Sequence, residues 1–303
     1  MGAAVFFGKV SRGGAEIAAG VREKDLPMIE LTRPIVRYHG GKWMLANWIT
    51  SFFPKHRCYV EPFGGGGSVL LRKSRSHSEV YNDLDGEIVN VFRMARDQGD
   101  ELCRLLTLTP YSRDEYDRTY ERIADPLEQA RRTIARTFMG FGSNTFRETT
   151  DGAIMRTGFR QQSSGSGRTP ARDWQNYPEA LKLITERLQG VVIENRDAVE
   201  VMRIHDAETT LHYVDPPYVF STRTDGRSDY RHELDDIAHL HLLKCLESLQ
   251  GMVILSGYPN ELYDDALSGW RRETRAAIAD GGAKRTEVLW MRNLPANGEL
   301  FPS

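Results

Sequence analysis

The sequence of 303 residues contains little cysteine, no long hydrophobic run and almost no net charge, and each shortage argues against a class of protein. Cys58, Cys103 and Cys245 lie far apart and form no CxxC pair, which argues against a disulfide scaffold or a cysteine zinc site and favours a reduced, cytoplasmic compartment. No stretch reaches the roughly 18 apolar residues of a membrane-spanning helix, and no metal-ligand cluster is visible. We therefore expect neither a membrane nor a metal ion as a partner.

The charge balance excludes a protein that is basic over its whole surface. Lysine and arginine together number 40 and the acids 42, which gives a formal net charge of -2. This total rules out a uniformly basic wrapper of nucleic acid but permits a basic patch, because attraction depends on the local distribution of charge. With 40% hydrophobic and 27% charged residues, the chain has ample material for a folded core.

Strands and helices are predicted to alternate in two parts of the chain. In the first part, the apolar run CYVEPF at 58–63 indicates a buried strand that meets a glycine turn. Helices at 42–52, 68–74 and 86–96 and a strand at 79–83 complete the start of a doubly wound α/β domain. In the second part, the expected strands are 190–195, 210–215, 252–257, 273–279 and 286–292, and the expected helices are 177–188, 198–204, 232–249 and 260–267.

The segment between these two parts differs in composition. Residues 112–139 have helical patterning, whereas residues 140–175 are polar and rich in Gly, Ser, Thr and Arg, which indicates loops or a hairpin. We therefore predict an α/β catalytic domain, residues 31–96 and 177–303, that is interrupted by an inserted, mainly helical module at 97–176. Residues 1–30 are predicted to form a loosely packed extension, and the sequence does not indicate the oligomeric state.

A glycine tract, EPFGGGG at 61–67, lies between a predicted strand and a predicted helix. Glycines in this place let the backbone approach a ligand closely. No Lys-Ser or Lys-Thr follows them, so the tract is not a phosphate-binding P-loop. Asp83 lies 16 residues beyond Gly67, at the end of the next strand, where a carboxylate suits a ribose hydroxyl pair. The pattern indicates a nucleoside ligand, although the tract alone fits a flexible turn equally well.

The sequence Asp215-Pro216-Pro217-Tyr218 directly follows an apolar strand. Two prolines fix φ and remove two N–H donors, so the Asp215 side chain and a rigid backbone carbonyl can both accept hydrogen bonds from one amino group. Tyr218 offers a flat face to a planar base. Two such acceptors favour the more nucleophilic nitrogen that an exocyclic amine develops in a transition state. An ordinary Pro-Pro turn is the alternative, and the upstream glycine turn argues against it.

A third element, RYHGGKW at 37–43, places a Gly-Gly-Lys turn before the first helix, although alone it fits a helix-capping loop better. In this order, the three elements resemble the Dam-type (α-group) DNA adenine methyltransferases, which use S-adenosylmethionine (SAM). The resemblance runs from about Arg33 to Arg292. It implies a Rossmann-like SAM-dependent methyltransferase sheet with an inserted target-recognition module. It also implies direct methyl transfer to the N6 amine of a flipped adenine in DNA.

The resemblance assigns a role to each residue of these motifs. It implies that Asp215 and the Pro216 carbonyl bind the target amine, that Pro217 completes the catalytic motif, and that Tyr218 stacks on the base. It also implies a cofactor site in which Tyr38 replaces the usual Trp. The expected cofactor-binding residues are Tyr38, Gly41, Lys42 (near the methionine carboxylate), Glu61, Pro62, Phe63, Gly64, Gly66, Asp83 (on the ribose) and Asp197 (on the adenine of SAM).

Arginine is concentrated in the predicted insert. Residues 131–172 hold eight arginines, no lysine and two acids, for a local charge of +6. Arginine-rich loops suit phosphate contacts and guanine readout, and a second basic run follows the catalytic motif at 221–232. A solvated charged module is the alternative. The expected contacts to double-stranded DNA are Arg131, Arg132, Arg136, Asn144, Arg147, Arg156, Arg160, Arg223 and Arg227.

The insert departs from the pattern of many relatives that methylate GATC, because their Asn-x-Pro-aromatic-Gly stretch is missing here. We therefore expect a different or relaxed target sequence. RNA adenine methylation and a non-catalytic, nucleic-acid-binding relic remain as alternatives. No nuclease domain accompanies the motifs, so a solitary modification enzyme of a phage or prokaryote, of the restriction-modification type, is expected.

Overall fold

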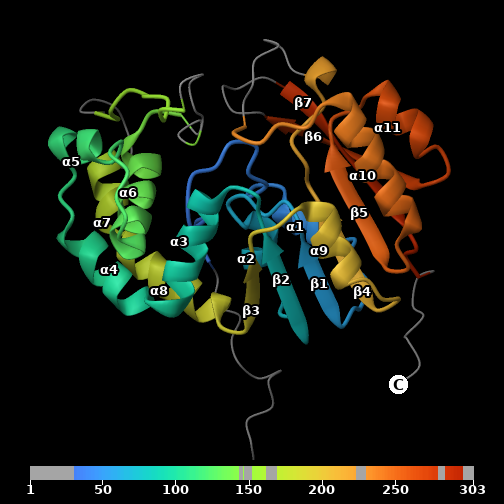
Figure 1. The fold of residues 1–303 in the computed structure, drawn as a ribbon, viewed down its shortest axis with the longest axis horizontal. Coiled ribbons are helices and arrows are strands. Elements are labelled where there is room, and N and C mark those ends of the chain that lie inside the picture. The colour runs from blue at the N-terminus through green and yellow to red at the C-terminus, as the bar shows by residue number, and fades with distance from the viewer. Residues whose placement is uncertain are drawn as a thin grey trace, which may run out of the picture.

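A single mixed sheet organises the protein. The computed structural model describes residues 31–142, 146, 152–161, 169–222, 230–278 and 284–295. In this part of the chain, seven strands pair in the order β3-β2-β1-β4-β5-β7-β6 (Figure 1). Strands β1 to β5 are parallel, and β7 runs antiparallel to β5 and to β6. Their bounds are β1 Cys58–Glu61, β2 Ser78–Asn82, β3 Val191–Glu194, β4 Thr210–Val214, β5 Met252–Gly257, β6 Arg271–Ile278 and β7 Lys284–Arg292.

Helices cover both faces of this sheet and extend beyond its β3 edge, where α4 to α8 gather (Figure 1). The α/β fold with a mainly helical segment between α3 and β3, which the sequence predicted, is confirmed. The helices are α1 Ala46–Thr50, α2 Ser68–Arg72, α3 Gly86–Asp97, α4 Gly99–Leu108, α5 Arg113–Arg118, α6 Pro126–Met139, α7 Pro170–Gln175, α8 Tyr177–Leu188, α9 Ala198–Ile204, α10 Asp236–Ser248 and α11 Glu261–Ala266.

Alternate side chains of the central strands enter two different cores. Tyr213 of β4 and Ile254 of β5 pack in a cluster with residues of α1 to α8. Their neighbours Val214 and Leu255 pack in a second cluster with residues of α9, α10 and α11. This alternation follows from the pleat, which points successive side chains to opposite faces. The protein therefore has three layers, with the sheet between two layers of helices.

The helical segment between α3 and α8 shares its core with the sheet. Leu102 of α4 and Ile134 of α6 belong to the same cluster of buried residues as Tyr81 of β2. The predicted boundaries of the insert, 97 and 176, fall at the end of α3 and just before α8. The division of the chain into domains at these residues stays a prediction, and the predicted extension at 1–30 lies outside the described residues.

Two predicted helices begin later than expected. The helix predicted at 42–52 is α1, Ala46–Thr50, because residues 43–45 form a turn and the Lys42 side chain is turned into an ion pair. The helix predicted at 232–249 is α10, which begins after Asp235, whose carboxylate accepts the Ala238 N–H. Residues 230–235 thus remain a loop. No helix in the described residues is both long and apolar enough to cross a bilayer.

Candidate active site

A cavity of about 730 Å³ opens at the carboxyl ends of the parallel strands. This is the edge at which open α/β sheets bind ligands. All of the cofactor-binding residues that the sequence predicted line this cavity: Tyr38, Gly41, Lys42, Glu61, Pro62, Phe63, Gly64, Gly66, Asp83 and Asp197. Of the predicted catalytic motif, Asp215 and Pro217 line it, whereas Pro216 and Tyr218 are buried next to them. The fold therefore brings together motifs that are more than 170 residues apart, and their individual roles stay predictions.

The glycine turn lies between β1 and α2, and at two of its positions a residue with a side chain would clash or be strained. A Cβ at Gly64 would collide with the Tyr81 ring, and Gly67 has a φ of 62° in the left-handed region. Gly67 is also the N-cap of α2 and offers no side chain to the first turn. Glu61 supplies the missing acceptor, because its Oε2 accepts the Leu70 N–H at 2.9 Å and the Tyr59 hydroxyl at 2.7 Å.

Asn82, at the end of β2, ties three strand ends together. Its side-chain amide donates to the carbonyls of Pro62, at 2.8 Å, and of Arg196, at 3.0 Å, and its oxygen accepts the Arg196 N–H at 2.9 Å. The side chain is fully buried, so these bonds satisfy groups that water cannot reach. Asn82 thereby holds the glycine turn against the segment that carries Asp197.

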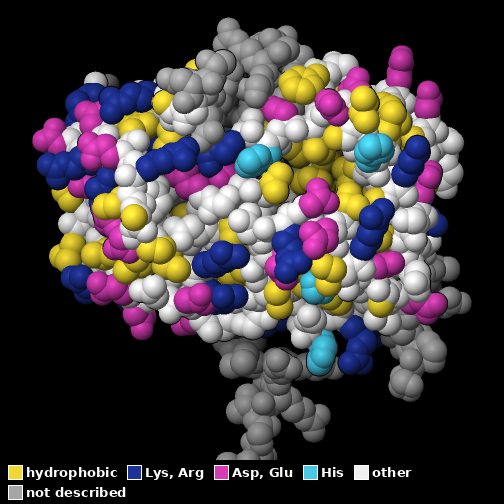
Figure 2. All heavy atoms as spheres, viewed as in Figure 1, with side chains coloured by type: hydrophobic (Ala, Val, Ile, Leu, Met, Phe, Trp, Pro, Cys, Tyr) yellow, Lys and Arg dark blue, Asp and Glu magenta, His cyan; other side chains and the backbone are white. Residues whose placement is uncertain are grey.

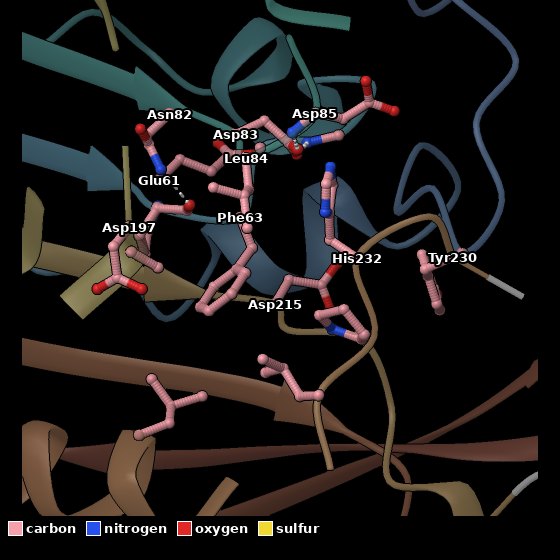
Figure 3. Close-up of a pocket in the computed structure, with 18 of the residues that line it drawn as sticks. Glu61, Phe63, Asn82, Asp83, Leu84, Asp85, Asp197, Asp215, Tyr230 and His232 are labelled. Carbon is pink, nitrogen blue, oxygen red and sulfur yellow. Dashed lines mark hydrogen bonds between the residues drawn. The ribbon is translucent and has the colours of Figure 1, made fainter. Parts of the chain in front are cut away.

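Two carboxylates lie on different sides of the Phe63 ring in the cavity (Figure 3). Asp83 accepts the N–H of Gly65 at Oδ2 and the N–H of Asp85 at Oδ1, both at 2.8 Å. Each oxygen keeps a second lone pair for a ligand hydroxyl. Burial raises the pKa of Asp83 to about 6, against the backbone N–H bonds that favour its charged form. Asp197 caps α9 and is exposed to the cavity.

Asp215 follows β4 and is held from two directions. Its Oδ1 accepts the Ser256 hydroxyl at 2.8 Å and lies 2.9 Å from the Lys42 ammonium. Lys42 also lies 3.7 Å from the Glu287 carboxylate and 4.7 Å from the centre of the Tyr218 ring. The Tyr218 hydroxyl donates to Glu287 at 2.8 Å. One buried ammonium is therefore shared by two carboxylates beside the catalytic motif.

Burial and charge pull in opposite directions in this group. Burial alone would lower the pKa of Lys42, but Asp215 and Glu287 outweigh it and raise the pKa above its ordinary value. Burial raises the pKa of Glu287, and the Lys42 ammonium opposes the rise. Burial also raises the pKa of Glu61, to about 8, against the hydrogen bond from Tyr59. In the described residues, no group of three or more His, Cys, Asp or Glu side chains is arranged to hold a metal ion.

The loop after the catalytic motif is anchored to the helical layer by ion pairs. Arg231 binds Asp85 at 2.5 Å and Glu87 at 2.9 Å, and Glu87 in turn binds Arg136 of α6 at 2.5 Å. Burial opposes the ionisation of Glu87, but Arg136 and Arg231 outweigh it and lower its pKa to about 2. A single carboxylate of α3 therefore connects the wall of the cavity with the segment predicted to recognise DNA.

Three of the arginines that the sequence assigned to DNA form ion pairs with acids of the protein. Arg136 has no exposed surface, Arg131 binds Glu115 and Glu128 at 2.6 Å, and Arg132 binds Glu128 at 2.8 Å. Because Arg131 and Arg136 are buried, the expectation that they contact DNA is corrected, whereas Arg132 is only partly buried and its contact with DNA stays a prediction. Basic side chains over this layer are interleaved with acidic ones (Figure 2, left).

Two other predicted DNA contacts lie nearer the surface. Arg156 is exposed, and its side chain lies over the Tyr120 ring, while Arg160 is half-buried and donates to the Phe138 carbonyl at 3.1 Å. Both remain candidates for contact with a nucleic acid. The other predicted contacts, Asn144, Arg147, Arg223 and Arg227, lie outside the described residues.

Comparison with known proteins agrees with this site. The sequence pattern of the D12 class N6 adenine-specific DNA methyltransferases matches residues 38–286. The chain belongs to this family. The resemblance that the motifs indicated is thus confirmed, and the protein is a DNA adenine methyltransferase. The methyltransferase is 32% identical to the DNA adenine methylase of Salmonella typhi, over 89% of this chain and 98% of that protein.

Two further relatives of this methyltransferase are more distant in sequence. The DNA adenine methylase of Escherichia coli K12 is 22% identical over 89% of this chain and 98% of that protein. The Type II methyltransferase M1.LlaDCHI of Lactococcus lactis subsp. cremoris is 23% identical over 83% of this chain and 90% of that protein. The matches extend across the glycine turn, the helical segment and the catalytic motif together.

Sequence reasoning missed Asn82, Ser256 and Glu287 of this methyltransferase. Glu287 is an acid inside the apolar strand TEVLWMR, which is an unusual place for a charge and is the one signal that could have singled it out. Its place beside Asp215 depends on β7 running antiparallel to β5, with Gly257 opposite Val288. That register is a property of the assembled sheet.

Proposed function

We propose that this methyltransferase transfers a methyl group from SAM directly to the N6 amine of an adenine that is turned out of double-stranded DNA. The observation that carries the proposal is the joining of Asp215 to the glycine turn, Asp83 and Asp197 in one cavity. The target is either a specific site or a relaxed one, because the insert lacks a stretch that many GATC-methylating relatives carry.

The residues of the cavity fit SAM by their chemistry. Asp83 offers two oxygens, each with a spare lone pair, to the ribose hydroxyls, and Asp197 offers a carboxylate to the adenine amine. A Cβ at Gly64 would collide with the Tyr81 ring and one at Gly65 with the Tyr38 ring, so only glycines let the backbone of this turn line the cavity so closely. When bound, SAM supplies an electrophilic methyl group whose bond to sulfur breaks as the bond to nitrogen forms.

Asp215 makes the target amine a better nucleophile. With the Pro216 carbonyl as second acceptor, its carboxylate holds the two N–H groups of N6, so the nitrogen lone pair turns away from the ring and toward the methyl group. The same carboxylate stabilises the positive charge that N6 acquires, and the surplus proton then passes to water. Tyr218 supports the base through its ring, and Arg156 and Arg160 contact the DNA backbone.

Asp215→Asn tests the assigned role, because it preserves the shape of the side chain and removes its charge. We expect methyl transfer to fall by about 10²–10³-fold, as for the loss of one preorganised electrostatic partner, while SAM affinity changes by less than about threefold. Tritium transfer to DNA measures the first quantity and titration calorimetry the second. Full activity of the variant would remove Asp215 from the mechanism.

Expression in a methylation-deficient host tests which base the protein methylates and in which sequence context. Expression of the protein, followed by sequencing of modified bases, should reveal N6-methyladenine in the host DNA. A single sequence context would identify a specific site, and a broad one a relaxed target. Unmodified DNA beside soluble, SAM-binding protein would contradict the proposed function and favour RNA as the substrate.

A further inference from the structure

Lys42 occupies the two places that the target base needs. Its ammonium lies 2.9 Å from Oδ1 of Asp215, the carboxylate proposed to accept the target amine. The same ammonium lies 4.7 Å from the centre of the Tyr218 ring, on which the base is proposed to stack. Oδ1 also accepts the Ser256 hydroxyl, so this oxygen already has two partners. Binding of the base to Oδ1 of Asp215 and to this face of the Tyr218 ring therefore requires Lys42 to move.

Glu287 is the second carboxylate beside Lys42, whose ammonium also donates to the Gly40 carbonyl at 2.9 Å. Its Oε1 lies 3.7 Å from Nζ, so a shift of about 1 Å would produce an ordinary charge-assisted hydrogen bond. The side chain of Glu287 is only 3% exposed, and the Tyr218 hydroxyl fixes it by donating to Oε1 at 2.8 Å. Because Glu287 binds the hydroxyl end of Tyr218, a movement of Nζ toward Glu287 carries the ammonium away from the face of the ring.

The charges favour such an exchange over release of Lys42. The Lys42 ammonium lies within 4 Å of two carboxylates, those of Asp215 and Glu287. Moving the ammonium between two carboxylates keeps it paired throughout, whereas an unpaired buried ammonium would be strongly destabilised. Asp215, once released by Lys42, keeps its negative charge for the amine.

We propose that Glu287 is a positioning residue: when the target base binds, the Lys42 ammonium moves from Asp215 to Glu287 and forms its ion pair there. The inference rests on the proposed function and adds to it a specific movement of the Lys42 ammonium. Glu287 itself does not touch the base or the methyl donor. It orients Tyr218 through the hydroxyl and frees Asp215 through Lys42.

Glu287→Gln tests the exchange, because the amide oxygen still accepts the Tyr218 hydroxyl but carries no charge for Lys42. We expect the single-turnover rate of methyl transfer to fall about 10- to 100-fold, the range that accompanies loss of one hydrogen bond to a charged group. SAM affinity and the KM for DNA should change by less than about threefold. Glu287→Asp, which keeps the charge, should recover most of the lost rate.

Glu273→Gln is the matched control, because Glu273 lies on neighbouring β6, is partly exposed and pairs with Arg271 at the surface. It should leave the rate of methyl transfer within about twofold of the native value. A native rate in Glu287→Gln would overturn the inference, and so would a loss confined to SAM affinity. Absence of methyl transfer to DNA by the native protein would instead contradict the proposed function.

A ternary complex with DNA and a non-transferable SAM analogue tests the exchange without mutation, and so does not depend on the folding of any variant. We expect Nζ of Lys42 within about 3.2 Å of Glu287 and a hydrogen bond between Asp215 and the amine of the base. Retention of Lys42 on Asp215, or its capture by the methionine carboxylate of the analogue, would overturn the inference.

Discussion

Glu61 shows how a single buried carboxylate serves both the fold and the cavity. It caps α2 where Gly67 has no side chain, and it lines the wall beside Asp215. Burial raises its pKa to about 8 in the folded protein, whereas an unfolded glutamate titrates at about 4.3. The stability that protonated Glu61 contributes is therefore complete below about pH 4 and is lost as the pH rises through about 8.

Glu61→Gln should remove this dependence on pH. We expect the unfolding free energy of the native protein to decline more steeply than that of the variant between about pH 5 and pH 8. The difference should reach a few kcal/mol, because each tenfold change in the proton affinity of a group corresponds to ~1.4 kcal/mol. Urea unfolding at several pH values measures both slopes, with Glu101→Gln, whose side chain is exposed on α4, as the control. Parallel slopes in native protein and variant would show that Glu61 does not titrate in this range.

At the level of elements, the pleat of the sheet decides which acids meet. Glu61, Asp83, Asp215 and Glu287 each lie two residues from a side chain of the same buried cluster: Tyr59, Tyr81, Tyr213 and Leu289. Residues two apart on an extended chain point to the same face, so all four acids project from one face at one edge of the sheet. Glu61 ends β1, Asp83 and Asp215 follow the parallel strands β2 and β4, and Glu287 reaches this edge only because β7 is antiparallel.

A buried ion pair connects α3 with α6. Arg136 is fully buried and pairs with Glu87, which also binds Arg231 in the wall of the cavity. Arg136→Met should lower the unfolding free energy by about 3–5 kcal/mol, because it leaves a buried carboxylate short of one partner. Chemical unfolding measures the loss.

Arg156→Ala provides the comparison for Arg136→Met, because Arg156 is 63% exposed and its pair with Asp117 spans 3.6 Å. Arg156→Ala should lower the unfolding free energy by less than about 0.5 kcal/mol. An equal loss of unfolding free energy in the two variants would show that the buried ion pair of Arg136 stabilises the protein no more than an exposed one does.

At the scale of the whole molecule, the protein has a formal net charge of -2. Several arginines of the predicted insert pair with acids from other segments, and they do not all form one basic surface. The +6 counted over residues 131–172 suggested a basic surface. The structure supplies acids from outside that window: Glu115, Glu128 and Glu87 pair with three of its arginines, Arg131, Arg132 and Arg136. Attraction to DNA therefore depends on the arginines that remain at the surface, which are fewer than the count implied.

The salt dependence of DNA binding should identify those arginines. If Arg156 contacts a phosphate, Arg156→Ala should reduce the slope of log K against log salt by about 0.9, the value for one contact to B-DNA. Arg104→Ala is the control for the loss of one exposed, paired arginine. Arg104 pairs with Glu101 on α4, whereas Arg156 pairs with Asp117 on α5, a different helix of this layer (Figure 1). Fluorescence anisotropy at several salt concentrations measures the slopes. An unchanged slope for Arg156→Ala would place the DNA elsewhere.

Much of the fold could be predicted from local patterns alone. The helix predicted at 177–188 and the strand predicted at 252–257 match α8 and β5 to the residue, because hydrophobic periodicity and turn residues are local signals. The start of α10 was predicted four residues early, since His232 to Asp235 fit a helical pattern but are held in the loop of the cavity. Contacts between distant segments overrode propensity there.

The sequence by itself determined the order of the elements, the glycine turn and the place of Asp215 after β4, because each depends on residues that are close in the chain. The tertiary structure decided which charges meet. Lys42 stands between Asp215 and Glu287, and Arg136 is buried against Glu87, through contacts that join residues from 49 to more than 240 positions apart. Electrostatic interactions depend on distance in space and on burial, and only the folded sheet and its helical layers set both.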